Sequence, residues 1–242
     1  GSRRRPLWAA ERLEASGSEV RGAALHLRPG LAVSGRVQIV DAGGSISLPP
    51  GASLALMPAN VGYVSPTASL EEAMGGAAIK PDGTFVIPDL KPDAAYRLFV
   101  NGLGEDVWPV SAVVGGIDLF DGPHVLGSGP LSESLVVTFS RTHTELFGTL
   151  TGAELISPIF VVAFPVNREH WAHERRTRAV QPDTNGRYRF DNLPPGEYWI
   201  GAIGDVDPNA WKSPSFLELL EKQALKVVLE HGERRQVDIR TR

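Results

Sequence analysis

The sequence contains no cysteine, and that absence removes several kinds of site at once. Without thiols the chain cannot form a disulfide framework, a zinc–thiolate centre or a cysteine nucleophile. It also has no apolar run long enough to cross a bilayer. Positive and negative side chains are mixed, with a net charge of −4, so the basic stripe typical of nucleic-acid binding is missing. We therefore predict no nucleic-acid partner and no membrane insertion in this segment.

Turn-forming and apolar residues are plentiful. The 242 residues include 26 glycines and 19 prolines, and 42% of them are hydrophobic. Frequent turn residues favour many short strands, and this length and apolar content are enough for two cores of ordinary size. A chain without cysteine is also compatible with an exported protein that folds without oxidation.

One motif occurs twice: a tight turn, a strand with aromatic residues, a leucine, a proline turn and a second strand with a tyrosine. In residues 185–200 the turn is Asn185-Gly186, and the aromatic residues that follow alternate with polar ones. Such alternation is the period of a strand with one buried face. Residues 82–98 repeat the same order, with Asp82-Gly83 at the turn. The recurrence predicts a tandem repeat of one β unit.

The repeat suggests three segments. Residues 1–19 are expected to be the tail of a preceding repeat or a tag, residues 20–128 a first β-sandwich, and residues 129–242 a second, with a hinge near residues 127–129. Residues 158–165 are almost continuously apolar, which predicts a central strand covered on both faces.

One short helix is predicted in the second unit. Ser213 has the character of an N-cap, and Pro214 suits the first helical position. An apolar stripe follows, made of Phe216, Leu217, Leu219 and Leu220.

The repeated motif resembles the carboxypeptidase regulatory-like domain, a transthyretin-like β-sandwich. The resemblance rests on the opening strands around Gly35 and Gly148 and on the turn, strand and proline-turn series already described, and it covers nearly the whole chain after residue 20. It implies an all-β fold of two tandem transthyretin-like or Ig-like sandwiches. Because such domains occur in peptidases, outer-membrane transporters and surface proteins alike, it implies little about activity. The metallopeptidases of that family carry their zinc ligands and catalytic glutamate in a separate domain, and nothing here matches them.

His170 and His173 are the best metal-ligand candidates in the sequence. Histidines three residues apart can share one helical face. Several arginines surround them and would repel a cation, so a solvated loop is the favoured interpretation and we predict no bound metal. Asp205, Asp207 and Asn209 have the spacing of Ca²⁺ ligands, but the later positions of an EF-hand loop do not match.

Tryptophan is the other candidate for ligand contact. Of the five tryptophans, most are expected to face a core, whereas polar neighbours favour exposure of Trp171. Trp171 and Trp211, together with His170 and His173, are therefore the residues that we would place at a ligand surface. No G-x-S-x-G motif and no evident nucleophile–histidine pair occurs, so we predict no catalytic residues and no cofactor.

These observations favour a non-catalytic structural or protein-interaction module from a larger exported bacterial protein, whether periplasmic, outer-membrane-associated or extracellular. Its expected partners are other domains of the same parent chain or of a surface assembly. A carbohydrate-binding module is the alternative, because of the tryptophans, and a glycan is then the partner. A hydrolase with an unrecognised site is a third hypothesis.

Overall fold

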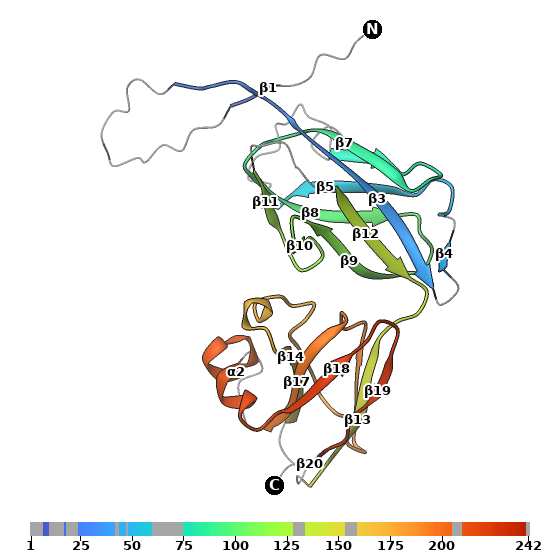
Figure 1. Cartoon of the computed structure of the whole chain (residues 1–242). Helices are drawn as coiled ribbons and strands as arrows, with labels where there is room; N and C mark the ends of the chain where they lie inside the picture. The colour runs from blue at the N-terminus through green and yellow to red at the C-terminus, as the bar shows by residue number, and fades with distance from the viewer. Residues whose placement is uncertain are drawn as a thin grey trace.

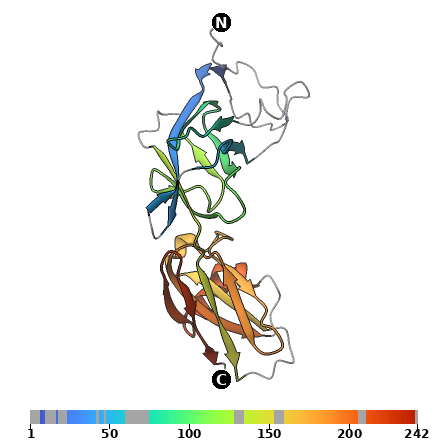
Figure 2. The same ribbon diagram turned by 90° about the vertical axis from the view of Figure 1, so that its right-hand side faces the viewer.

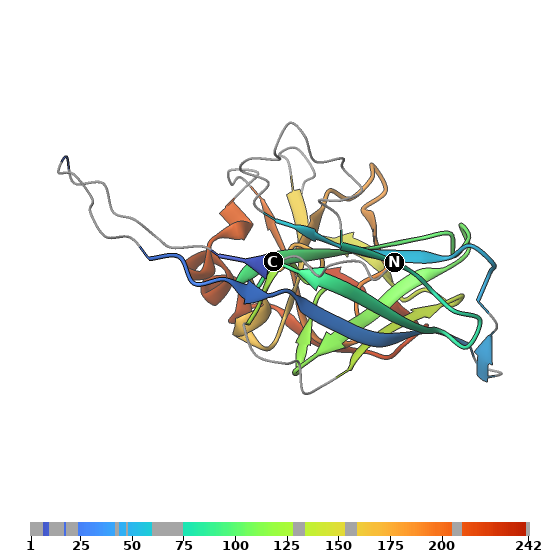
Figure 3. The same ribbon diagram turned by 90° about the horizontal axis from the view of Figure 1, so that it is seen from above.

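The computed structural model describes residues 7–9, 17, 24–41, 44–46, 48–59, 75–127, 134–152, 159–204 and 210–240. Asp205, Asp207 and Asn209, most of residues 1–19 and two residues of the predicted hinge, 128 and 129, lie outside these ranges. Within these ranges the fold is all-β with one short helix, and it forms two sandwiches arranged end to end (Figures 1 and 2). Seen from above, the sandwiches lie one behind the other (Figure 3).

The first sandwich consists of two sheets. One sheet has the strand order β10-β9-β12-β3-β4, and β7 also pairs with β3. The other has the order β11-β8-β5-β6. A separate two-stranded ribbon, β1 with β2, precedes them. The bounds are β1 Leu7–Trp8, β2 Arg28–Pro29, β3 Leu31–Asp41, β4 Gly44–Ile46, β5 Ser53–Pro58, β6 Gly75–Ala78, β7 Thr84–Leu90, β8 Ala94–Asn101, β9 Trp108–Val114, β10 Ile117–Asp118, β11 His124–Leu126 and β12 Leu135–Ser140.

The second sandwich has two four-stranded sheets. The first contains β16-β13-β19 with β20 beside β13, and the second has the order β15-β14-β17-β18. Two 3₁₀ turns and the helix α2 lie outside these sheets. The bounds are β13 Glu145–Thr151, β14 Ile159–Pro165, η1 Arg168–His170, β15 Arg178–Val180, β16 Arg187–Asp191, β17 Gly196–Gly204, η2 Ala210–Lys212, α2 Pro214–Glu221, β18 Leu225–Leu229, β19 Arg234–Gln236 and β20 Ile239–Arg240.

The strand β14 confirms the prediction of an apolar strand covered on both faces. Val161 and Ala163 on one face belong to the core between the two sheets. Val162 and Phe164 on the other face pack against Leu217 of α2 and its neighbours. Because successive side chains of a strand point to opposite faces, a strand buried on both sides has to be apolar throughout.

The strand β12 corrects the expected boundary between residues 128 and 129. That boundary assigned Leu135–Ser140 to the second sandwich. In the structure β12 pairs in parallel with β3 and antiparallel with β9, so its hydrogen bonds lie in the first sandwich. Leu135 and Val137 accordingly belong to the first core. Only residues 141–144 separate β12 from β13.

The two copies of the repeated motif form the same local structure. Gly83 and Gly186 have φ angles of 83° and 76°, and each accepts a hydrogen bond of 2.8 Å from a neighbouring strand. The hydroxyl of Tyr96 donates to the carbonyl of Lys91 at 3.0 Å. The equivalent bond in the second copy is donated by Tyr198 to Pro194 at 2.7 Å. The tyrosine therefore ties the proline turn to the following strand in both sandwiches.

The helix α2 begins as predicted, with Ser213 at the N-cap and Pro214 at the start, but its predicted apolar stripe is only partly buried. Leu217 and Leu220 are buried, whereas Leu219 is 60% exposed. Leu217 and Leu220 are three residues apart and therefore lie on the same side of the helix, the side that packs against the sheet. Within the described residues no helix is both long and apolar enough to cross a membrane.

Candidate functional site

The two predicted histidines lie in the connection between β14 and β15. The side-chain oxygen of Asn167 accepts a hydrogen bond from the backbone N–H of Glu169 at 3.1 Å and so begins the turn η1. The backbone N–H of His173 then donates to the carbonyl of His170 at 3.1 Å. This compact turn brings the two imidazole rings to a centroid separation of 5.5 Å. The two rings therefore lie next to each other, although His173 follows the turn and is not part of it.

The expected exposure of Trp171 is wrong. Its side chain is only 6% exposed, and its indole N–H donates to the carbonyl of Pro165 at 2.8 Å. The ring packs edge-on against Phe164, and the guanidinium of Arg168 lies 5.1 Å from the ring centroid. The neighbours Arg168 and Glu169 are exposed, while η1 directs the indole onto the outer face of the sheet. An indole that is covered in this way cannot stack on a sugar.

Trp211 does not complete a ligand platform with Trp171. It is partly buried, and it packs with α2 against the outer face of the sheet. The ammonium group of Lys212 lies 5.5 Å from its ring centroid. The four residues predicted for a ligand surface therefore separate into two buried or partly buried tryptophans and one pair of histidines.

The histidine loop meets the first sandwich through a cluster of four charged side chains. Arg176 Nε lies 2.6 Å from Asp121 Oδ2, and Arg175 Nη1 lies 3.3 Å from Asp118 Oδ2. The side-chain exposures are low: 16% for each arginine, 10% for Asp118 and 6% for Asp121. The expectation that these arginines belong to a solvated loop is therefore wrong. We call this group the inter-sandwich clasp.

Backbone groups of the first sandwich complete the clasp. Arg175 Nη2 donates to the carbonyls of Pro109 and Val110, at 3.0 and 2.6 Å. Asp118 Oδ1 accepts from the backbone N–H groups of Ala112 and Phe120, at 2.9 and 3.0 Å, so the acceptor is itself held in place. Burying a charge is costly unless it is paired and hydrogen-bonded, and here each charged group has an oppositely charged partner.

Asp121, His170 and His173 lie together beside the clasp. Each offers one ligand atom, and these atoms all lie within 4.8 Å of one another. His173 Nδ1 is 3.1 Å from the backbone carbonyl of Asp121, which also links the two sandwiches. Sequence reasoning missed Asp121, because nothing local marks a single aspartate in a loop as the neighbour of histidines about fifty positions away.

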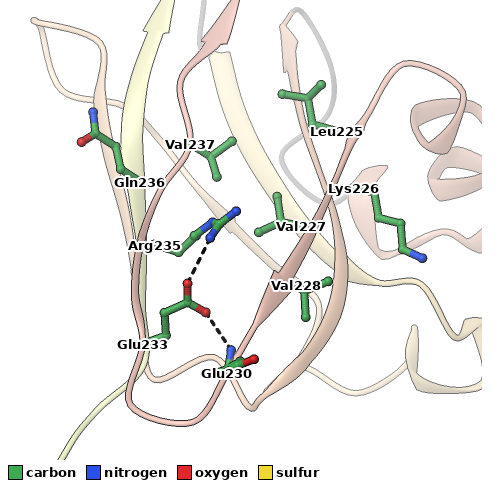
Figure 4. A pocket seen from close by; sticks show the side chains of 9 residues that line it. All are labelled: Leu225, Lys226, Val227, Val228, Glu230, Glu233, Arg235, Gln236 and Val237. Carbon is green, nitrogen blue, oxygen red and sulfur yellow. Dashed lines mark hydrogen bonds and ion pairs between the residues drawn. The ribbon is translucent and has the colours of Figure 1, made fainter.

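A groove lies elsewhere, between β18 and β19 (Figure 4). Its volume is about 770 Å³, and apolar residues such as Val227 and Val237 line it together with charged ones. Glu233 accepts from Arg235 at 3.3 Å and from the backbone N–H of Glu230 at 2.9 Å. Charged side chains on edge strands discourage pairing with another chain, so this edge has the character of a protected one. None of the four predicted ligand-contact residues lines it.

Comparison with known proteins gives only distant structural similarity. No family model matches the sequence, and no curated protein is significantly similar to it. The minor pilin GBS52 of Streptococcus agalactiae is 13% identical, with a TM-score of 0.34 over 87% of this chain and 95% of that chain. The shaft pilin SpaA of Lactobacillus rhamnosus GG is 12% identical, with a TM-score of 0.29 over 87% and 96%. The pilus backbone protein RrgB of Streptococcus pneumoniae is 10% identical, with a TM-score of 0.28 over 86% and 64%. These scores are too low to support an inference about this chain.

Proposed function

We propose that this chain is a non-catalytic structural segment, a rigid spacer of two sandwiches within a larger exported bacterial protein. Each sandwich is assigned to the carboxypeptidase regulatory-like type on the basis of the repeated motif. The observation that carries the proposal is the inter-sandwich clasp. A spacer has to hold its ends apart, and freely hinged domains would not do so.

The clasp suits this role because its groups are both buried and shared between the sandwiches. Two arginines of the second sandwich face two aspartates of the first, with side-chain exposures between 6% and 16%. In such surroundings a pair is less screened by water and salt than an exposed pair would be. The arrangement pairs all four charges in one relative orientation, so rotation of one sandwich would leave charges buried without partners.

The short connection between β12 and β13 also restricts the movement of one sandwich relative to the other. Residues 141–144 join β12 to β13. Within this connection the backbone carbonyl of Thr144 accepts from the N–H of Asn192 at 2.8 Å, which attaches it to the proline turn of the second sandwich. The hydroxyl of Thr142 lies 2.9 Å from that of Ser140. A connection that is hydrogen-bonded at both ends has little freedom to act as a hinge.

The partners that we propose are the neighbouring domains of the parent chain or of a surface assembly. We do not extend the proposal to glycan binding, because Trp171 is buried and hydrogen-bonded.

Since the chain lacks cysteine, a label can be attached at introduced cysteines without reaction elsewhere in the chain.

A distance measurement between the sandwiches tests the spacer. Spin labels at Val86→Cys in the first sandwich and Leu219→Cys in the second are placed at side chains that are 52% and 60% exposed. Pulsed electron paramagnetic resonance should give one narrow distance distribution. The double variant Arg175→Gln/Arg176→Gln should broaden it. Arg189→Gln, which removes a side chain that is 61% exposed, is the matched control and should leave it narrow. A broad distribution in the unmodified background would overturn the proposal.

A further inference from the structure

We infer that Asp121, His170 and His173 form a site for a divalent transition-metal ion, with ligands from both sandwiches. Asp121 follows β10 in the first sandwich, and the histidines lie in and just after η1 in the second. All three residues are partly buried, the side chain of Asp121 is only 6% exposed, and their ligand atoms lie within 4.8 Å of one another. The inference goes beyond a spacer function and does not depend on it.

Two of the three ligand groups carry a buried atom that lacks a hydrogen bond. Among the described residues, Asp121 Oδ1 and His170 Nδ1 are both inaccessible to solvent and accept or donate no hydrogen bond. Buried polar atoms are nearly always satisfied, so an unsatisfied one calls for a specific explanation. Here two such atoms occur in one cluster. A cation bound between them would satisfy both at once.

The hydrogen bond of the third residue, His173, leaves its Nε2 as the nitrogen available to a metal. His173 Nδ1 lies 3.1 Å from the backbone carbonyl of Asp121. A carbonyl can only accept, so Nδ1 carries the proton in this contact and Nε2 keeps its lone pair. Ligating histidines typically donate from one nitrogen to a carbonyl or carboxylate in this way, which fixes the ring and the tautomer.

The arginines limit the affinity of the site but do not exclude it. Arg176 Nε contacts Asp121 Oδ2, and this leaves Oδ1 as the ligand atom. Arg175 lies 3.6 Å from Oδ1, but its guanidinium is also held by Asp118 and by backbone carbonyls. The two arginines are balanced by the two aspartates, so the cation would enter a locally neutral site. We therefore expect weaker metal binding than at a site without neighbouring cationic side chains.

The ligand types favour Zn²⁺. Two imidazole nitrogens and one carboxylate oxygen match its preferences, with water in a fourth position. In a tetrahedral site with bonds of about 2.0–2.1 Å, ligand atoms lie roughly 3.3 Å apart. Ligand atoms that lie as far apart as 4.8 Å would have to move closer together to bind the ion.

Isothermal titration calorimetry of the full chain with Zn²⁺ tests the site. Co²⁺ serves as a second probe, because its visible spectrum reports tetrahedral nitrogen and oxygen coordination. The test variants are His170→Gln, His173→Gln and Asp121→Asn. The matched control is His26→Gln, which removes an exposed histidine outside the cluster. Circular dichroism and metal-free melting curves show whether each variant is folded.

We expect one Zn²⁺ per chain, a tetrahedral Co²⁺ spectrum and a higher melting temperature with Zn²⁺. Each test variant should weaken binding by at least about 10-fold, the usual effect of losing a metal-supporting group. His26→Gln should bind as the unmodified chain does. Absence of binding below millimolar Zn²⁺, or binding that folded His170→Gln and His173→Gln retain, would overturn the inference. This experiment measures metal binding and not the distance between the sandwiches. A failure to bind metal would therefore leave the spacer proposal unaffected.

Discussion

Arg176 Nε lies 2.6 Å from Asp121 Oδ2, and these two residues belong to different sandwiches. Fifty-five residues separate them in the sequence, so the contact forms only when both sandwiches are folded and docked. Since its members are mostly buried, the pair contributes to the relative orientation of the sandwiches more strongly than an exposed pair could.

The first prediction concerns this pair. Replacing Arg176 by glutamine leaves Asp121 buried with only the longer contact to Arg175, at 3.6 Å. Breaking a buried pair typically costs roughly 3–5 kcal/mol, and the remaining arginine should reduce this to about 2 kcal/mol. Urea denaturation measures the change. The control Arg189→Gln should change stability by less than about 0.5 kcal/mol, because its side chain is 61% exposed. Equal small effects of both substitutions would contradict the prediction.

The second prediction concerns stability at alkaline pH. Burial raises the pKa of Tyr198 from 10.0 to about 12. The folded state therefore favours the protonated phenol, and this contribution is complete below about pH 10 and lost as the pH rises toward about 12. This difference in pKa between the folded and unfolded states corresponds to about 2–3 kcal/mol.

Tyr198→Phe tests that contribution. The variant should lose about 1 kcal/mol at neutral pH, because the bond to the carbonyl of Pro194 is removed. Its stability should then fall less steeply than that of the unmodified chain between about pH 10 and 12. Denaturation curves across this range, with absorbance at the phenolate band, measure both effects. Parallel pH profiles for the two proteins would count against the assignment.

Local patterns in the sequence predicted much of each sandwich. The turns at Gly83 and Gly186, the alternation in β7 and β16, and the continuous apolar strand β14 are all properties of short segments. Such features depend on backbone freedom and on the strand period, which can be judged residue by residue.

The errors concern contacts between distant segments. The residues of β12 resemble the first strand of the second unit. The sheet that they join is nevertheless decided by pairing with β3, about a hundred positions earlier. Trp171 has polar neighbours in sequence, yet η1 turns its ring toward the sheet. The clasp likewise joins charges that look solvated when each is considered alone. Pairing of this kind cannot be found from one sequence without knowledge of the docking.

The third prediction tests the burial of Trp171. Trp171→Phe removes the indole N–H that donates to Pro165 and leaves that carbonyl without its partner. The loss of this bond and of ring contacts should cost about 1–3 kcal/mol. The difference between the fluorescence spectra of the two proteins should have a short-wavelength maximum, because the missing ring lies in an apolar environment. A difference spectrum typical of a water-exposed indole would show that the loop lies differently.

The last prediction compares glycines at equivalent places in the two sandwiches. A β-carbon at Gly35 would collide with the carbonyl of Leu135 and the ring of Phe85, and one at Gly148 would collide with the carbonyl of Val237 and the hydroxyl of Tyr188. Backbone atoms in a paired sheet cannot move aside cheaply, so each change to alanine should cost about 1–3 kcal/mol, as overpacking does.

Gly127→Ala is the matched control, because its added β-carbon would meet nothing within 4 Å. It should be neutral or slightly stabilising, through reduced freedom of the unfolded chain. Thermal unfolding of the three variants measures the comparison. Comparable losses at Gly35 and Gly148 would indicate that both units use the same close approach of an opening strand to a parallel partner. A loss at only one of them would mean that the sandwiches share a sequence motif but pack their opening strands differently.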